Sequence, residues 1–115
     1  MTGVPLINVL LTYDTFGRLK HFEVTGHDGS QTAGSNIVCA SVSILALTFA
    51  KSLLELLEIP MSGTIEKGCI SLSLIGNSPV RAEDLNLLLK SFKLGISSII
   101  KEYGNVIDIK EKTLN

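Results

Sequence analysis

An alternation of apolar and polar residues near the start of the chain restricts the fold most. Apolar side chains recur at every second position in Leu6–Tyr13, and a shorter alternation follows in Leu19–Thr25. A period of two is typical of β-strands with one buried face. The residues between them, DTFGR, include Gly17 and favour a turn. The sequence therefore predicts a hairpin of these two strands, with His21 and Glu23 on its solvated face.

The next segment predicts a long helix that starts at Ser35 or Asn36, either of which can serve as the N-cap, and ends near Pro60. Its apolar stripe recurs at three- and four-residue steps: Ile37, Ala40, Ile44, Leu47, Leu54 and Leu57. Because the first half is almost wholly apolar, we expect it to be buried on more than one face. The run 37–50 is shorter than the ~20 residues of a membrane span, so it favours a core helix and no membrane association.

The second half of the chain repeats the strand and helix patterns. Two short strands are expected around Lys67–Gly68, with Cys69 on the serine-bearing face of the second. A second helix is expected to open at Ser78-Pro79 and to stop at Gly104, followed by a strand in NVIDIK. The apolar stripe of that helix comprises Leu85, Leu88, Leu89, Phe92, Ile96, Ile99 and Ile100.

The resulting order is β-β-α-β-β-α-β, in which strands and helices do not strictly alternate. This order predicts an α+β two-layer sandwich, with one mixed sheet and both helices on one face. A chain of 115 residues without repeats or linkers fits one domain, residues 1–115.

Composition narrows the classes of function. Ten Lys and Arg residues against eleven Asp and Glu give a net charge of −1, which disfavours nucleic-acid binding. The N-terminal residues do not resemble a secretion signal, so we expect a cytoplasmic protein with free thiols. Two irregularly spaced cysteines and two histidines do not make a zinc site, and no cofactor is expected. The mean hydropathy of +0.39 fits either a homodimer interface or a leucine- and isoleucine-rich core.

The glycine-rich loop between His27 and Cys39 suggests nucleophilic catalysis. If Asn36 caps the helix, Cys39 is its third residue, where unpaired backbone N–H groups and the helix dipole favour a thiolate. His27, held at the end of a strand, could take the thiol proton and later protonate the leaving amine. On spacing alone, an inert buried cysteine and a solvated histidine are the more frequent outcome.

GHDG, a spacer with Gly34, and NIVCASVS together resemble the signature of the ribosomal-processing cysteine protease (Prp) family. The resemblance extends over the whole chain. It implies a small bacterial cytosolic homodimer that removes the N-terminal extension, ending in bulky apolar residues, of a large-subunit ribosomal protein. By match to the motif, it assigns the nucleophile to Cys39 and the base to His27.

Two positions depart from the family pattern. The family box usually starts with aspartate, whereas this chain has Asn36, which could cap the helix or orient the imidazole but carries no charge. Asp28 replaces a small residue after His27 and is a candidate third catalytic member. Three glycines, Gly26, Gly29 and Gly34, are interpreted as giving a substrate loop its freedom to fold.

Three classes of function remain at this point. The first is a site-specific cysteine endopeptidase, and the second is a non-catalytic dimeric module that docks on a ribosomal or assembly partner. The third is a thiol redox sensor, although Cys69 has no CxxC relation to Cys39.

Overall fold

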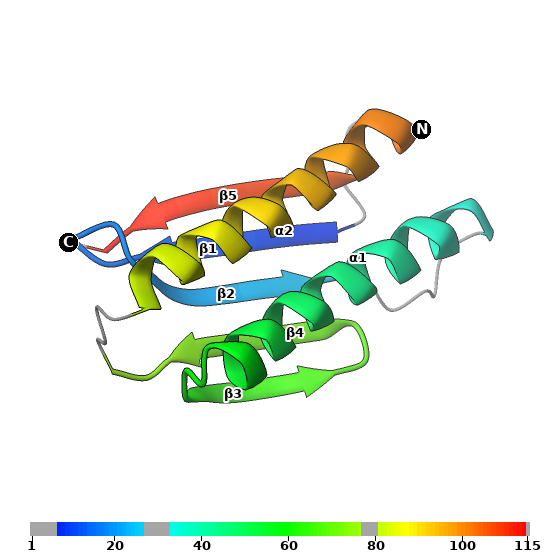
Figure 1. Cartoon of the computed structure of the whole chain (residues 1–115). Coiled ribbons are helices and arrows are strands. Elements are labelled where there is room, and N and C mark those ends of the chain that lie inside the picture. The colour runs from blue at the N-terminus through cyan, green and yellow to red at the C-terminus, as the bar shows by residue number, and fades with distance from the viewer. Residues whose placement is uncertain (1–6, 27–32, 77–80, 115) are drawn as a thin grey trace.

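A five-stranded mixed sheet forms one layer of the fold in this computed structural model, which describes residues 7–26, 33–76 and 81–114. The strand order is β3-β4-β2-β1-β5, and β5 runs parallel to β1 while the other neighbours are antiparallel (Figure 1). The strands are β1 (Ile7–Tyr13), β2 (Leu19–Thr25), β3 (Met61–Glu66), β4 (Cys69–Leu74) and β5 (Ile107–Thr113).

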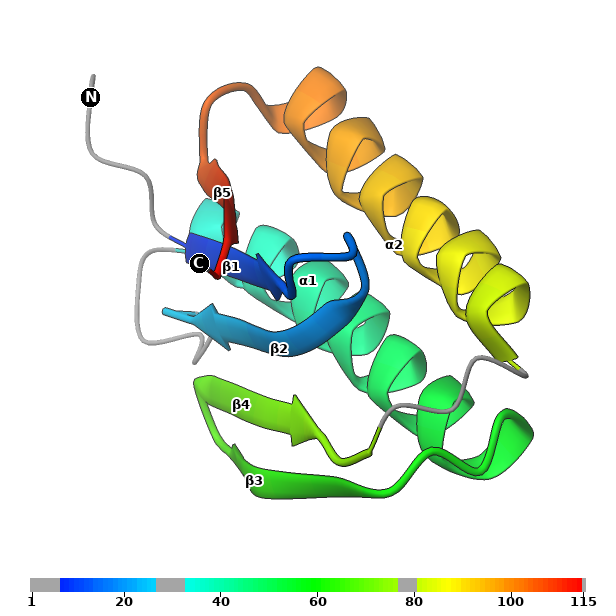
Figure 2. The ribbon, with the colours of Figure 1, turned by 90° about the vertical axis from the view of Figure 1, so that its left-hand side faces the viewer.

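Two antiparallel helices form the second layer. Helix α1 (Ala33–Lys51) continues into a π-helical turn, η1 (Ser52–Leu56), and α2 (Ala82–Tyr103) follows β4. Both cover the same face of the sheet, as the two views show (Figures 1 and 2). The predicted two-layer α+β sandwich is therefore confirmed.

The β1–β2 hairpin has the strand limits that alternation predicts, to within one residue. In the turn, the Asp14 carboxylate accepts hydrogen bonds from the backbone N–H groups of Phe16 and Arg18, at 2.8 and 2.9 Å. The N–H of Arg18 contributes most to lowering the pKa of Asp14 below its ordinary value. Gly17 adopts a φ of 80°, a left-handed conformation that glycine tolerates without strain.

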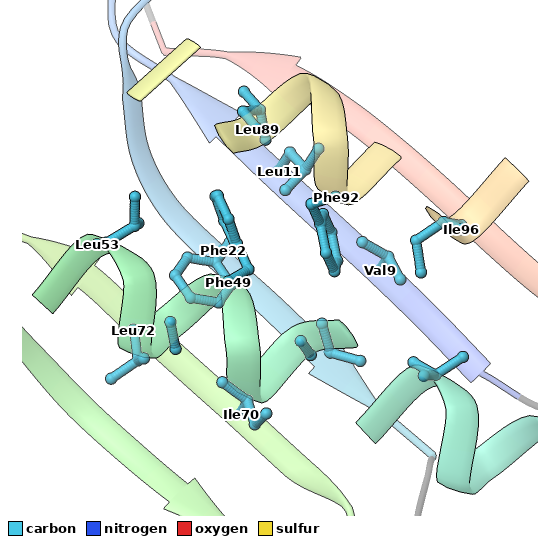
Figure 3. Close-up of a cluster of buried hydrophobic side chains, with 14 of the residues drawn as sticks. Val9, Leu11, Phe22, Phe49, Leu53, Ile70, Leu72, Leu89, Phe92 and Ile96 are labelled. Atoms are coloured by element: carbon cyan, nitrogen blue, oxygen red, sulfur yellow. The ribbon is translucent and has the colours of Figure 1, made fainter. Parts of the chain in front are cut away.

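The core lies between the sheet and the helices, and three phenylalanines cross it (Figure 3). The ring of Phe49 in α1 packs edge-on against Phe22 of β2 and is stacked on Phe92 of α2, with both centroid separations at 5.0 Å. Phe49 therefore connects all three elements. Offset stacking and edge-to-face contacts are the favoured arrangements of aromatic rings.

The prediction of which α1 face is buried is wrong. The buried side chains are Val38, Cys39, Val42, Ala46, Phe49 and Ala50. Ile37 and Ile44, assigned to the buried stripe, are 54% and 65% exposed, and the first half of the helix is buried on one face only. In this part of α1, apolar residues occupy every side of the helix, so the periodicity of the sequence could not identify the buried face.

One segment, Ile37–Leu56, is long and apolar enough to cross a membrane, with a mean hydropathy of 2.0. Core helices of soluble proteins pass the same test of length and composition. Here only 39% of the apolar stretch is buried. The helix thus presents an unusually apolar outer surface.

Both helices begin at positions other than those predicted. Helix α1 starts at Ala33, so Asn36 lies inside its first turn and is not the N-cap. Helix α2 starts at Ala82 with Arg81 at its N-cap position. The predicted start at Ser78-Pro79 lies outside the described residues. The predicted end at Gly104 is confirmed, because its N–H caps the carbonyl of Ile100.

The helix-free face of the sheet carries a polar cluster around His21. The ring Nδ1 lies 2.7 Å from Ser73 Oγ, and Nε2 lies 3.5 Å from Glu23 Oε1. Ser71 donates a hydrogen bond to the same Glu23 oxygen at 3.2 Å. His21 and Glu23 are therefore half-buried and paired across β2 and β4, whereas the sequence predicted solvated side chains.

Gly63 is required by the close approach of β3 to β4. Its φ is 139°, and a Cβ at this position would lie 2.0 Å from the backbone oxygen of Ser71. We expect Gly63→Ala to lower the free energy of unfolding by more than about 1 kcal/mol, because the strands must separate. Urea denaturation monitored by circular dichroism would measure the loss. Gly17→Ala is the control, since Gly17 has a positive φ but no atom within 4 Å, and an equal effect of both variants would contradict the steric argument.

Candidate active site

Cys39 lies in the second turn of α1, on the side that faces the sheet. Its side chain is only 1% exposed and belongs to the hydrophobic core. The thiol donates a weak hydrogen bond to the backbone carbonyl oxygen of Gly26, with Sγ and O 3.8 Å apart. Only a protonated thiol can make this bond.

Gly26 joins three segments at this end of the molecule. It follows β2 with a φ of 90°, and its N–H donates to the carbonyl of Gly68 in the β3–β4 turn at 3.1 Å. Its own carbonyl accepts from Cys39. The chain thus enters the loop directly beside the sulfur. His27, Asp28 and Gly29, which follow Gly26, lie outside the described residues.

The start of α1 changes the electrostatic argument for Cys39. With Ala33 as the first helical residue, Cys39 is the seventh, and the unpaired N–H groups belong to residues 33–36. The predicted third position is therefore wrong. The dipole of a helix acts mainly within its first turn, so its support for a Cys39 thiolate is weaker than the sequence suggested. Gly34, which the sequence assigned to the substrate loop, is helical and lies in that first turn together with Asn36.

A cavity of about 320 Å³ lies between α1 and the β3–β4 turn, with Gly68 in its lining. It is lined by Ser43, Leu47, Ile65, Glu66, Lys67, Gly68 and Ile70. Ser43 lies one helical turn after Cys39, Glu66 is the last residue of β3, and Lys67 belongs to the β3–β4 turn. Apolar side chains from α1, β3 and β4 complete the lining.

The contribution of β3 and β4 to this region was not predicted from the sequence. The link depends on pairing between distant strands, in which Thr25 of β2 faces Cys69 and Cys69 faces Glu66. No local motif around residues 65–70 indicates this proximity. Only the register of the sheet brings the β3–β4 turn beside α1.

Cys69 occupies the other face of the sheet. It is half-buried at the first position of β4, on the same face as Ser71 and Ser73, as predicted. Cys39 and Cys69 are both free thiols separated by the sheet, an arrangement that excludes a disulfide between them without rearrangement. Within the described part of the chain, no three His, Cys, Asp or Glu side chains gather as metal ligands would.

Comparisons with known proteins identify the class. The chain matches the family described as cysteine protease Prp over residues 6–108. It is 26% identical to SMU.848 from Streptococcus mutans, with a TM-score of 0.72, covering 95% of this chain and 99% of that one. It is also similar in fold to the essential ribosomal processing protease Prp from S. aureus in complex with a substrate peptide. That similarity has a TM-score of 0.76 at 18% identity, over 92% and 99% of the two chains.

No curated protein matches the chain significantly. The family match nevertheless spans nearly all of it, and the protein is therefore a cysteine protease. Within this class, the chain belongs to the cysteine protease Prp family.

Proposed function

We propose that this protein is a cytoplasmic, cofactor-independent endopeptidase that removes the N-terminal extension of a large-subunit ribosomal protein. The observation that carries the proposal is the family match over residues 6–108. The S. aureus relative, described as a ribosomal processing protease and solved with a substrate peptide, supports the substrate class. The net charge of −1 agrees with a protein substrate and no direct binding of nucleic acid.

We assign the chemistry to Cys39 and His27. The imidazole accepts the thiol proton, and the Cys39 sulfur then attacks the scissile carbonyl carbon. Collapse of the tetrahedral intermediate breaks the C–N bond, and the imidazolium protonates the leaving amine. Water, deprotonated by the same imidazole, hydrolyses the thioester and regenerates the thiol. The hydrogen bond from Cys39 to Gly26, the residue before His27, supports this pairing.

Catalysis requires the buried thiol to become accessible. In this proposal, the Cys39–Gly26 hydrogen bond breaks as the peptide binds, which frees the sulfur for attack. Asn36, in the first turn of α1, and Asp28, next to His27, are the candidates for orienting the imidazole.

We assign the cavity beside the β3–β4 turn to an apolar residue of the substrate. Leu47, Ile65 and Ile70 supply apolar walls, and the volume of about 320 Å³ accommodates a large side chain. The contacts from Cys39 to Gly26 and from Gly26 to Gly68, which lines the cavity, support this assignment. Bulky apolar residues at the end of an extension would fit it.

Mass spectrometry of the substrate tests the proposal directly. A large-subunit ribosomal protein with an N-terminal extension would be incubated with the enzyme at a 1:1 ratio. We expect one cut, which yields the shortened protein and a peptide with an apolar C-terminal region. An unchanged mass after prolonged incubation would contradict the proposed substrate, and cuts at many sites would contradict the site specificity.

We also propose that the active form is a homodimer that packs through the outer face of α1. Ile37 and Ile44 lie on this face and are more than half exposed, and Ala40 between them is exposed as well. A contiguous exposed apolar surface on a protein of this size is typical of an interface. A second copy of the same helix would bury it symmetrically.

We expect Ile44→Glu to shift the protein from dimer to monomer, because a carboxylate would be buried in the interface without a partner. Analytical ultracentrifugation over a range of concentrations would measure the change. Ile75→Glu is the matched control, since Ile75 is comparably exposed but follows β4 and does not lie on α1. A wild-type protein that is monomeric at micromolar concentration would refute the dimer.

A further inference from the structure

A second cavity, of about 330 Å³, lies at the end of the sheet opposite Cys39. Four segments meet there: the start of β2, the end of β4, the start of α2 and the chain that leaves η1 (Figure 1). Its lining comprises Arg18, Leu19, Lys20, Leu57, Glu58, Ile59, Pro60, Leu74, Ile75, Gly76, Arg81 and Leu85. Because β2 spans seven residues, roughly 20 Å separate this cavity from Gly26 and the proposed catalytic thiol.

The floor of this cavity is apolar. Leu19, Leu57, Leu74 and Leu85 each belong to the buried core, and each also lines the cavity. Their positions are fixed by packing on four different elements. Ligand sites of small molecules typically have this character, with a preformed apolar wall and a few polar groups that set orientation.

The rim of the cavity is predominantly basic. Arg18, Lys20 and Arg81 line it, against a single acidic residue, Glu58. These are three of the ten Lys and Arg residues in a chain whose net charge is −1. Basic residues thus outnumber acidic residues by three to one in the lining of this cavity.

Each of the two arginines has N–H donors beyond those that pair with its acidic neighbour. Arg18 uses Nε to pair with Asp14 at 3.0 Å, and Nη1 of Arg81 lies 3.7 Å from Asp84. A guanidinium carries five N–H donors on three nitrogens. One pairing through one nitrogen thus leaves donors that can bind a carboxylate. Neither Asp14 nor Asp84 lines the cavity.

The backbone at Glu58 is strained. Its φ of 54° is the one positive value at a non-glycine residue among residues 7–26, 33–76 and 81–114. Glu58 directly follows Leu57, the C-cap of η1, and a left-handed residue at this position is a common way for a helix to end. Here the N–H of Ile59 donates to the carbonyl of Leu53, and Pro60 accepts from the N–H of Ile75. These bonds hold the segment that carries Glu58 against the cavity.

We propose that this cavity binds a small apolar molecule that carries one carboxylate. The apolar body would lie on the leucine floor, and the carboxylate would be held by Arg81 and Arg18 at the rim. Two sources share this chemistry: a free medium-chain carboxylic acid, and the C-terminal residue of a peptide that ends in a leucine-like side chain. A cation of the same shape would be excluded, because the rim is basic.

The test is an NMR titration of the full chain, with octanoate as the first probe. A pentapeptide with C-terminal leucine and its C-terminal amide are the second pair, and octylamine is the control of opposite charge. We expect saturable shifts at Leu57–Pro60 and Leu74–Gly76 with octanoate, with the peptide acid, or with both. The probe whose shifts saturate, either octanoate or the peptide acid, identifies which of the two sources of the carboxylate binds. Absence of shifts with both acids, or equal binding of octylamine or the peptide amide, would overturn the proposal.

Two variants with opposite expected signs sharpen the test. We expect Arg81→Gln to weaken binding of the acid by about tenfold, through loss of charge-assisted hydrogen bonds. Glu58→Gln is expected to strengthen binding about two- to threefold, because it removes a like charge. Lys101→Gln, near the other end of α2, makes the same change of net charge and should leave the affinity unchanged. Equal effects of Arg81→Gln and Lys101→Gln would overturn the assignment of Arg81.

Discussion

Cleavage of the ribosomal substrate should fall by at least about 10³-fold when Cys39 is replaced with alanine. The substitution removes the sulfur that forms the thioester, so no covalent intermediate can arise. His27→Ala should reduce cleavage similarly, since the thiol then has no base. Quantitative mass spectrometry of substrate and product over time would measure both rates.

Cys69→Ala is the matched control because it removes the other free thiol, on the opposite face of the sheet. It should cleave at the wild-type rate. It also provides a protein with a single cysteine, in which alkylation reports on Cys39 alone. We expect slow alkylation of Cys39 in the free protein, because its thiol is only 1% exposed. Normal cleavage by Cys39→Ala would refute the catalytic assignment and favour a non-catalytic role.

Phe49→Ala should have the largest effect on stability, with a loss of about 3–5 kcal/mol. Phe49 is 4% exposed and contacts both Phe22 and Phe92, so its removal leaves a cavity between the sheet and both helices. Because small domains are typically stable by only about 5–15 kcal/mol, the variant should be close to unfolding at room temperature. Chemical denaturation with two independent probes would measure the change.

The same substitution at Phe16 provides the control. Phe16 is 80% exposed in the β1–β2 turn, where the Arg18 guanidinium lies 5.0 Å from the centre of its ring. We expect Phe16→Ala to change the stability by less than about 1 kcal/mol. A comparable loss at both positions would show that the three-ring contact is not the source of the stability.

Strands were predicted more accurately than helices, and the reason lies in their patterns. Alternation identified β1, β2 and β4 because polar residues mark the outer face of each. In α2, Leu85, Leu89, Phe92 and Ile96 were assigned correctly because charged residues occupy the opposite side. The start of α1 was missed because Asn36 satisfies the rules for an N-cap although the helix begins three residues earlier.

The candidate site was predictable only as a motif. The sequence indicated Cys39 through its place after a glycine-rich loop, and resemblance to a family strengthened that assignment. Burial of the thiol, its contact with Gly26 and the nearby β3–β4 turn depend on sheet register, which no local pattern specifies. The exposure of Ile37 and Ile44 was likewise not predicted, because apolar residues occupy every side of α1 and the sequence does not mark a solvent-facing side.

The pairing of β1 with β5 also affects the order in which the sheet can form during synthesis. These strands are the first and last described elements of the chain, and they lie side by side in parallel register from Ile7 to Tyr13. During synthesis, β1 can pair with β2 early, but its other edge stays open until almost the whole chain has emerged. Folding that depends on such distant segments is slow compared with local hairpin closure. A nascent chain should therefore expose one unpaired edge of β1 until β5 has been synthesised.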